Sequence, residues 1–120
     1  MEQFSLLIGT LMQSRNQAHI YHLQTNSYAQ HVALQGYYEG IIPLIDGLVE
    51  SYQGQYGILR GYKMAGVLKE DDNPAMYFEG LSKFFEALKP SLPQDSFLVN
   101  QYDEVGSLLQ STKYKLKFLH

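Results

Sequence analysis

Three of the four histidines of this chain, His19, His22 and His31, lie close together in the sequence. Asp46 and Glu50 follow, spaced so that they are one turn apart on a helix. Two imidazoles and two carboxylates form a ligand set that suits Fe(II), Zn(II) or Mn(II). The chain has no cysteine, which excludes thiolate metal sites, disulfides and a cysteine nucleophile. The first question is therefore which helices carry these residues and how they are oriented.

Apolar residues recur at helical spacing from Phe4 onward and predict a first helix over residues 2–23. Residues 25–27 form a short break that contains good N-cap residues. A second helix is expected over residues 27–53, with Pro43 producing a kink inside it. His19 and His22 then lie near the end of the first helix, and His31 lies near the start of the second.

Residues 54–73 form a long connection, with one short helical piece expected at its centre. Asn73 and Pro74 are a cap followed by proline at the first helical position, and they predict a third helix over residues 74–88. Ser91 and Gln94 resemble a capping box and predict a fourth helix that ends near residue 118.

Helices joined by short connections are antiparallel neighbours, and the long connection can cross the length of the bundle, as in ferritin-like folds. We therefore expect an all-α fold: a ferritin-like four-helix bundle with one long crossover connection between the second and third helices. At 120 residues the whole chain, 1–120, is one domain.

Composition narrows the class of protein further. The chain is 45% hydrophobic and 18% charged, as a folded domain is. No apolar run approaches a membrane span and the first residues lack a signal-peptide pattern, so we expect no membrane contact and a cytoplasmic protein. The net charge of −3 and the absence of a basic tail give no reason to expect nucleic-acid binding.

Four polar residues of the second helix share one stripe of its surface: His31, Gln35, Asp46 and Glu50. His31 and Asp46 are about 22 Å apart along the helix axis, so one chain cannot close the stripe on a single metal ion. Two copies of the helix that cross antiparallel would set His19 and His31 of one chain against Asp46 and Glu50 of the other. A two-fold homodimer provides this geometry and forms two equivalent sites.

The spacing resembles that of the miniferritins, the DNA-binding proteins from starved cells (Dps). Their signature is Gln-Ala-His, a second His, a carboxylate one turn later, and then Asp and Glu one turn apart. The matching residues here are Gln17, Ala18, His19, His31, Asp46 and Glu50. The sequence is also similar to small uncharacterised proteins of this fold encoded by phages, which would place it in a host cytoplasm.

The resemblance implies an iron-binding protein that oxidises Fe(II) and stores the product in a hollow oligomer, a dodecamer in the family. His19 and His31 would bind the metal from one chain, and Asp46 and Glu50 would bind it from the partner chain. Gln35 stands where the family has a carboxylate, and Ile20 replaces a tryptophan that quenches reactive oxygen chemistry. Loss of one carboxylate predicts one well-held metal and weak ferroxidase activity.

Two further residues are accessory candidates. His22 has no counterpart in the family and is expected at the surface or in contact with the loop, with a role as an accessory ligand as the alternative. Glu39 lies near the expected crossing point and should pair with a basic residue or water, again with metal binding as the alternative.

A second function, from a different class, is a non-catalytic ferritin-like assembly module. In that case no metal binds, His19 and His31 form a hydrogen-bonded pair, and Asp46 and Glu50 are an ordinary solvated helix edge. The residue types at Gln35 and Ile20 favour this alternative, whereas the four matching ligand positions favour the metal site.

Overall fold

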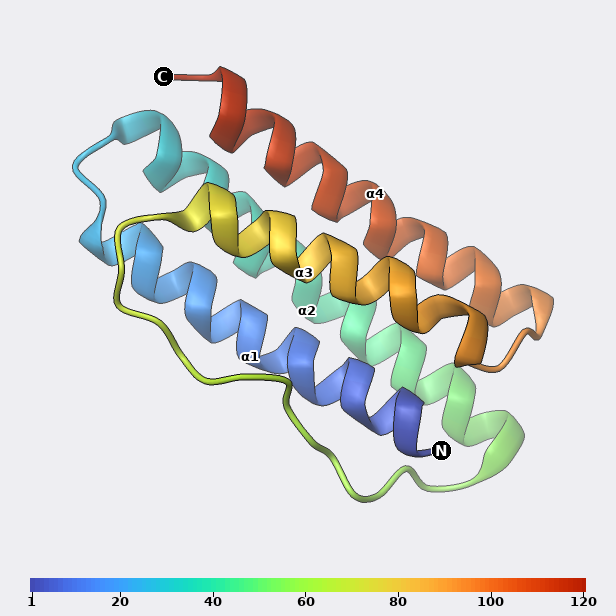
Figure 1. Ribbon diagram of the computed structural model, residues 1–120. Coiled ribbons are helices and arrows are strands. Elements are labelled where there is room, and N and C mark those ends of the chain that lie inside the picture. The colour runs from blue at the N-terminus through green and yellow to red at the C-terminus, as the bar shows by residue number, and fades with distance from the viewer.

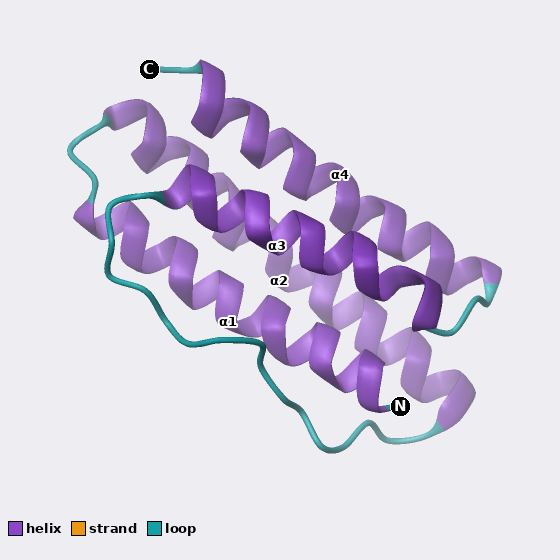
Figure 2. Cartoon of the chain, viewed as in Figure 1, coloured by secondary structure: helices purple, strands orange, loops and turns teal.

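The computed structural model describes residues 1–120 and contains four long α-helices and no strand (Figure 1; Figure 2). In chain order the elements are α1 (Glu2–Gln24), α2 (Tyr28–Tyr56), α3 (Pro74–Leu88), the short 3₁₀ helix η1 (Lys89–Ser91) and α4 (Ser96–Phe118). The all-α class predicted from the sequence is confirmed. None of the helices combines the length and the apolar character that crossing a bilayer requires.

The long connection between α2 and α3, residues 57–73, determines how the helices are oriented. It runs back along α1 from the end of α2, so that α3 starts at the opposite end of the bundle and is parallel to α2 (Figure 1). The principal helix contacts are α1 with α2, α2 with α4 and α3 with α4. Each of these pairs is antiparallel. We call residues 57–73 the crossover loop.

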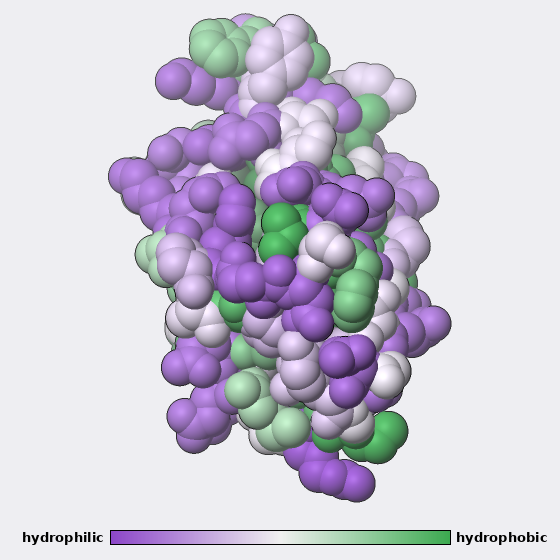
Figure 3. Space-filling model, turned by 90° about the vertical axis from the view of Figure 1, so that its right-hand side faces the viewer, coloured by the Kyte–Doolittle hydropathy of each residue, from purple (hydrophilic) through white to green (hydrophobic).

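The apolar stripe of α1 is buried as its spacing predicts. Phe4, Leu7, Ile8 and Leu11 are completely buried, whereas Met12 is 42% exposed. The four buried residues belong to a core of 23 buried hydrophobic residues, which come mainly from the four helices. On the end of the bundle seen in Figure 3, hydrophilic side chains separate the apolar ones into small patches.

α2 runs without interruption through Pro43, as expected, and its start is well capped. The hydroxyl of Ser27 accepts a hydrogen bond from the backbone N–H of Gln30, at 3.2 Å. This bond satisfies one of the free N–H groups at the helix start. The connection between α1 and α2 is thereby a tight turn, which brings the end of α1 beside the beginning of α2.

The predicted start of the fourth helix at Ser91 is wrong. The hydroxyl of Ser91 donates to the carbonyl of Leu88, at 2.7 Å, and so closes the end of the preceding helix. α4 starts at Ser96, with Asp95 as its N-cap residue. The carboxylate of Asp95 makes no capping hydrogen bond and instead accepts one from the hydroxyl of Tyr56, at 2.5 Å.

The short helical piece expected in the crossover loop is also absent, because side chains of α1 bind the backbone of this loop. The amide group of Gln17 accepts from the N–H of Lys69 and donates to its carbonyl, at 2.5 and 2.9 Å. The hydroxyl of Thr10 accepts from the N–H of Ala65, at 2.9 Å. Backbone groups that a helix would pair internally are therefore bonded to α1 instead.

Candidate metal centre

His22 and His31 make a close contact across the turn between α1 and α2. Their rings are stacked with centroids 3.6 Å apart and an angle of 19° between the planes. His22 Nδ1 lies 2.7 Å from the carbonyl oxygen of His31, and His31 Nδ1 lies 2.9 Å from the carbonyl oxygen of His22. A carbonyl oxygen only accepts, so both Nδ1 atoms carry a proton, and in a neutral ring the free lone pair is then on Nε2.

Of the two places expected for His22, the structure shows a buried contact at the turn and not a surface position. Only 7% of His22 is exposed, because its ring packs against the rings of His31 and Tyr38 of α2. A metal bond lies in the plane of an imidazole ring. Two nearly parallel stacked rings cannot direct their lone pairs at one ion, so this arrangement gives His22 a structural role.

His19 lies at the same end of the bundle as His31, but the two rings are separated by His22. The centroids of His19 and His22 are 5.9 Å apart. His19 stacks on Tyr38 of α2 at 4.4 Å, and the guanidinium carbon of Arg15 lies 5.1 Å from the centroid of the same tyrosine ring. His19 and His31 make no contact with each other, contrary to the expectation, because the ring of His22 packs against His31 and the ring of His19 packs against Tyr38.

Asp46 and Glu50 are exposed on α2 and have no hydrogen bond or ion pair within the chain. Asp46 lines a shallow groove of about 280 Å³ together with Met12, Arg15 and Ile42 of the outer α1–α2 face. No group of three or more His, Asp or Glu residues in the chain could hold a metal ion. A single chain therefore does not bring the candidate ligands together. His19 and His31, which we call the imidazole half-site, lie at the end of the bundle where α1 meets α2, and Asp46 and Glu50, which we call the carboxylate half-site, lie toward the other end of α2.

Gln35 and Glu39 are bonded to each other on the exposed surface of α2. The amide nitrogen of Gln35 donates to the carboxylate of Glu39, at 2.6 Å. The basic partner expected for Glu39 is not found within the chain. Gln35, one turn earlier on α2, bonds to Glu39 instead. A neutral amide is a poor ligand for iron, so Gln35 does not replace the carboxylate that the miniferritins have at this position.

Sequence reasoning did not identify the link between Tyr21 of α1 and Asp71 of the crossover loop. The hydroxyl of Tyr21 donates to the Asp71 carboxylate at 2.9 Å. The backbone N–H of Asn73 and this hydroxyl hold the pKa of Asp71 below its usual value. Burial and the neighbouring carboxylate raise the pKa of Tyr21. The only local signal was the turn composition around Asp71 and Asn73.

The donor chemistry of the four remaining candidates fits a divalent metal. The Nδ1–H of His31 is held by a backbone carbonyl, the arrangement that orients metal-binding histidines and leaves Nε2 free for the ion. The carboxylates of Asp46 and Glu50 have no competing partner within the chain. These four residues could bind one metal ion only if a second chain brought the two half-sites together.

Comparison with known proteins identifies a family without indicating an activity. Residues 22–116 match the model of a family described as a family of unknown function, DUF5856. The matched region includes His31, Asp46 and Glu50 and begins after His19. No curated protein and no solved structure matches the chain.

Proposed function

The chain belongs to DUF5856, a family of unknown function, and we propose that it is a homo-oligomeric protein that binds Fe(II) at a site shared across a two-fold interface. His31 of one chain supplies one imidazole ligand, His19 of the same chain supplies a second after its ring leaves the stack on Tyr38, and Asp46 and Glu50 of the second chain supply two carboxylates. Zinc and manganese suit the same ligand set, and the resemblance to the miniferritins favours iron.

The separation of the two half-sites along α2 carries the proposal. The imidazoles and the carboxylates lie about 22 Å apart along the helix axis, too far to meet within one chain. A two-fold axis near the middle of α2 places the imidazole half-site of each chain next to the carboxylate half-site of the other chain. One contact between two copies therefore forms two complete ligand sets.

The surface between the half-sites supports such a contact. Met12 of α1 and Ile42 of α2 are each 42% exposed and flank the groove that Asp46 lines. Packing against a second chain would remove these apolar side chains from water. The crossover topology, with α2 parallel to α3, also supports the ferritin-like fold that the resemblance implies.

Fe(II) is the substrate of the proposed reaction, and it supplies the electron that an oxidant such as peroxide or oxygen accepts. The protein holds the ion, keeps His31 in the tautomer with a free Nε2, and provides two negative charges that favour Fe(III) as the product. With Gln35 in place of a third carboxylate, one ion is well held. Oxidation that needs a second ion should be slow.

The assembly module remains the second candidate function. Gln35 and Glu39 bond to each other, and His22 and His31 are joined by hydrogen bonds and a ring stack, so all four side chains have partners without a metal. In this alternative the same α1–α2 face joins the subunits, and its polar stripe binds nothing. Metal content separates the two functions.

The test is metal loading of the wild type, of His31→Ala and of His120→Ala, with oligomeric state measured by light scattering. His120 is the exposed C-terminal residue and serves as a matched control. We expect the wild type and His120→Ala to be dimers or larger and to retain about one iron per chain, whereas His31→Ala stays assembled without iron. A monomeric wild type, or a His31→Ala variant with full metal content, would contradict the shared site. An assembled wild type that binds no metal would support the module.

A further inference from the structure

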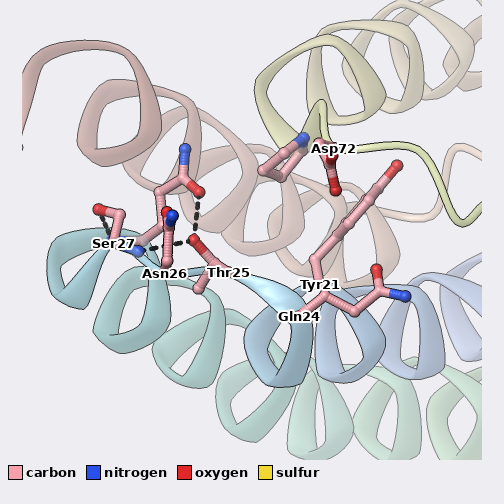
Figure 4. Close-up of a pocket in the computed structure, with 8 residues that line it drawn as sticks. Tyr21, Gln24, Thr25, Asn26, Ser27 and Asp72 are labelled. Carbon is pink, nitrogen blue, oxygen red and sulfur yellow. Dashed lines mark hydrogen bonds between the residues drawn. The ribbon is translucent and has the colours of Figure 1, made fainter.

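A polar pocket lies between the α1–α2 turn and the beginning of α3. Its volume is about 370 Å³, within the usual range for small-ligand sites. Figure 4 shows Asp72 on the side of the crossover loop, opposite Gln24, Thr25 and Asn26 of the turn region. The pocket contains no residue of either proposed half-site.

Several polar groups of the pocket are already hydrogen-bonded and hold its shape. The hydroxyl of Thr25 donates to the side-chain oxygen of Gln30 at 2.7 Å and accepts from the N–H of Ser27 at 3.1 Å. The Gln30 side chain uses only its oxygen in this bond, and its amide nitrogen, with two N–H donors, makes no hydrogen bond within the chain. The hydroxyl proton of Tyr21 is committed to Asp71.

Other groups of the pocket have no partner. Asp72 forms no hydrogen bond and no ion pair, unlike the neighbouring Asp71. The side-chain amides of Gln24 and Asn26 are also unbonded and exposed. The pocket therefore offers one free carboxylate, several free amide N–H donors and no cationic side chain.

We propose that this pocket binds a small zwitterion of the free amino acid class. An ammonium group would bind to Asp72, and a carboxylate would accept hydrogen bonds from the amide N–H groups of Gln24, Asn26 and Gln30. An inorganic cation would bind Asp72 and amide oxygens of Gln24 or Asn26, and it would leave the amide N–H donors unpaired. A neutral polyol would leave the charge of Asp72 uncompensated, so it complements the pocket less well.

The proposal can be tested by NMR titration of the whole chain with L-serine. Three matched probes each lack part of the zwitterion: ethanolamine lacks the carboxylate, lactate lacks the ammonium group, and glycerol lacks both. We expect saturating shifts of the Thr25, Asn26 and Asp72 amides with serine only.

Two variants test whether the carboxylate of Asp72 binds the ammonium group. Asp72→Asn should weaken serine binding at least about tenfold. Glu70→Gln removes the same charge from a neighbouring residue that does not line the pocket, and it should leave the affinity within about twofold. The amide spectrum of each variant checks that it is folded. The proposal is overturned if serine gives no saturating shift up to about 20 mM, if glycerol binds as well as serine, or if Asp72→Asn binds serine like the wild type.

Discussion

His22 and His31 bind each other through two reciprocal hydrogen bonds, in which each ring donates its Nδ1 proton to the backbone carbonyl of the other residue. The two rings also stack, with centroids 3.6 Å apart. The pair joins the end of α1 to the beginning of α2. It therefore fixes the position of His31 relative to the end of α1.

Replacement of His22 should weaken this junction. We expect His22→Ala to lower the free energy of unfolding by about 2 kcal/mol, because it removes the ring stack and leaves the carbonyl of His31 without its donor. His22→Phe keeps the stack and loses the hydrogen bond, so its stability should be intermediate. Urea denaturation measures both, with His120→Ala as the control. A fully stable His22→Ala variant would show that the pair does not hold the turn.

Gly9 is a second sensitive position, because the crossover loop passes directly over it. A Cβ at this position would clash with the backbone carbonyl of Lys63. We expect Gly9→Ala to cost about 1–3 kcal/mol of stability, as overpacking does. Gly36 in α2 has no atom near its Cβ position, so Gly36→Ala should stabilise the chain by about 0.5–1 kcal/mol. Equal urea midpoints for the two variants would be inconsistent with the position of the loop.

The link between Tyr21 and Asp71 predicts a pH dependence. The N–H of Asn73 and the hydroxyl of Tyr21 lower the pKa of Asp71 in the folded state below the unfolded value of about 3.9. The ionised carboxylate therefore contributes stability above about pH 4, and this contribution is lost as the pH falls through the folded-state pKa. Asp71→Asn should be less stable than the wild type at neutral pH, and the difference should shrink in acid.

Urea unfolding at a series of pH values measures this effect. Asp103→Asn is the control, since Asp103 is exposed on α4 and has no hydrogen-bond partner. A stability difference for Asp71→Asn that is constant from neutral to acid pH would exclude the ionised carboxylate as its source.

Gln35→Asp should restore the anionic ligand that the chain lacks. In the metal-free protein it removes the bond to Glu39 and places two carboxylates one turn apart, which should cost a few tenths of a kcal/mol, on the order of other like-charge pairs. Added metal should reverse this loss, and a second ion should bind with faster Fe(II) oxidation. Gln35→Asn, which has the same length as Asp and no charge, is the control. Identical oxidation rates for the two variants would count against a ferroxidase-type site.

The helices themselves could largely be predicted from local sequence. The third helix was predicted over the observed residues, because Asn73 caps it by accepting from the N–H of Met76 and Pro74 fits its first position. The prediction for Ser91 is wrong because a capping box and the closing of a preceding 3₁₀ turn use the same residue types. A local pattern does not show which helix end the side chain binds.

Features that depend on distant contacts could not be predicted in this way. The course of the crossover loop is held by Thr10 and Gln17, which bind backbone groups of residues far along the chain. Helical periodicity placed His22 near the end of its helix but did not identify His31 as its stacking partner. Sequence spacing also predicts His19, His31, Asp46 and Glu50 as metal ligands, and this prediction stays a proposal because it requires a second chain.

The most direct test of the shared site is a mixed dimer of two complementary variants. One chain carries His19→Ala and His31→Ala, and the other carries Asp46→Asn and Glu50→Gln. Each variant alone lacks half of every site and should bind no iron. In the mixed dimer, the intact histidines of one chain meet the intact carboxylates of the other at one of the two sites. The account predicts about half of the wild-type iron content for the purified mixed dimer. A mixed dimer without iron, or either variant alone with wild-type iron content, would contradict a site shared between chains.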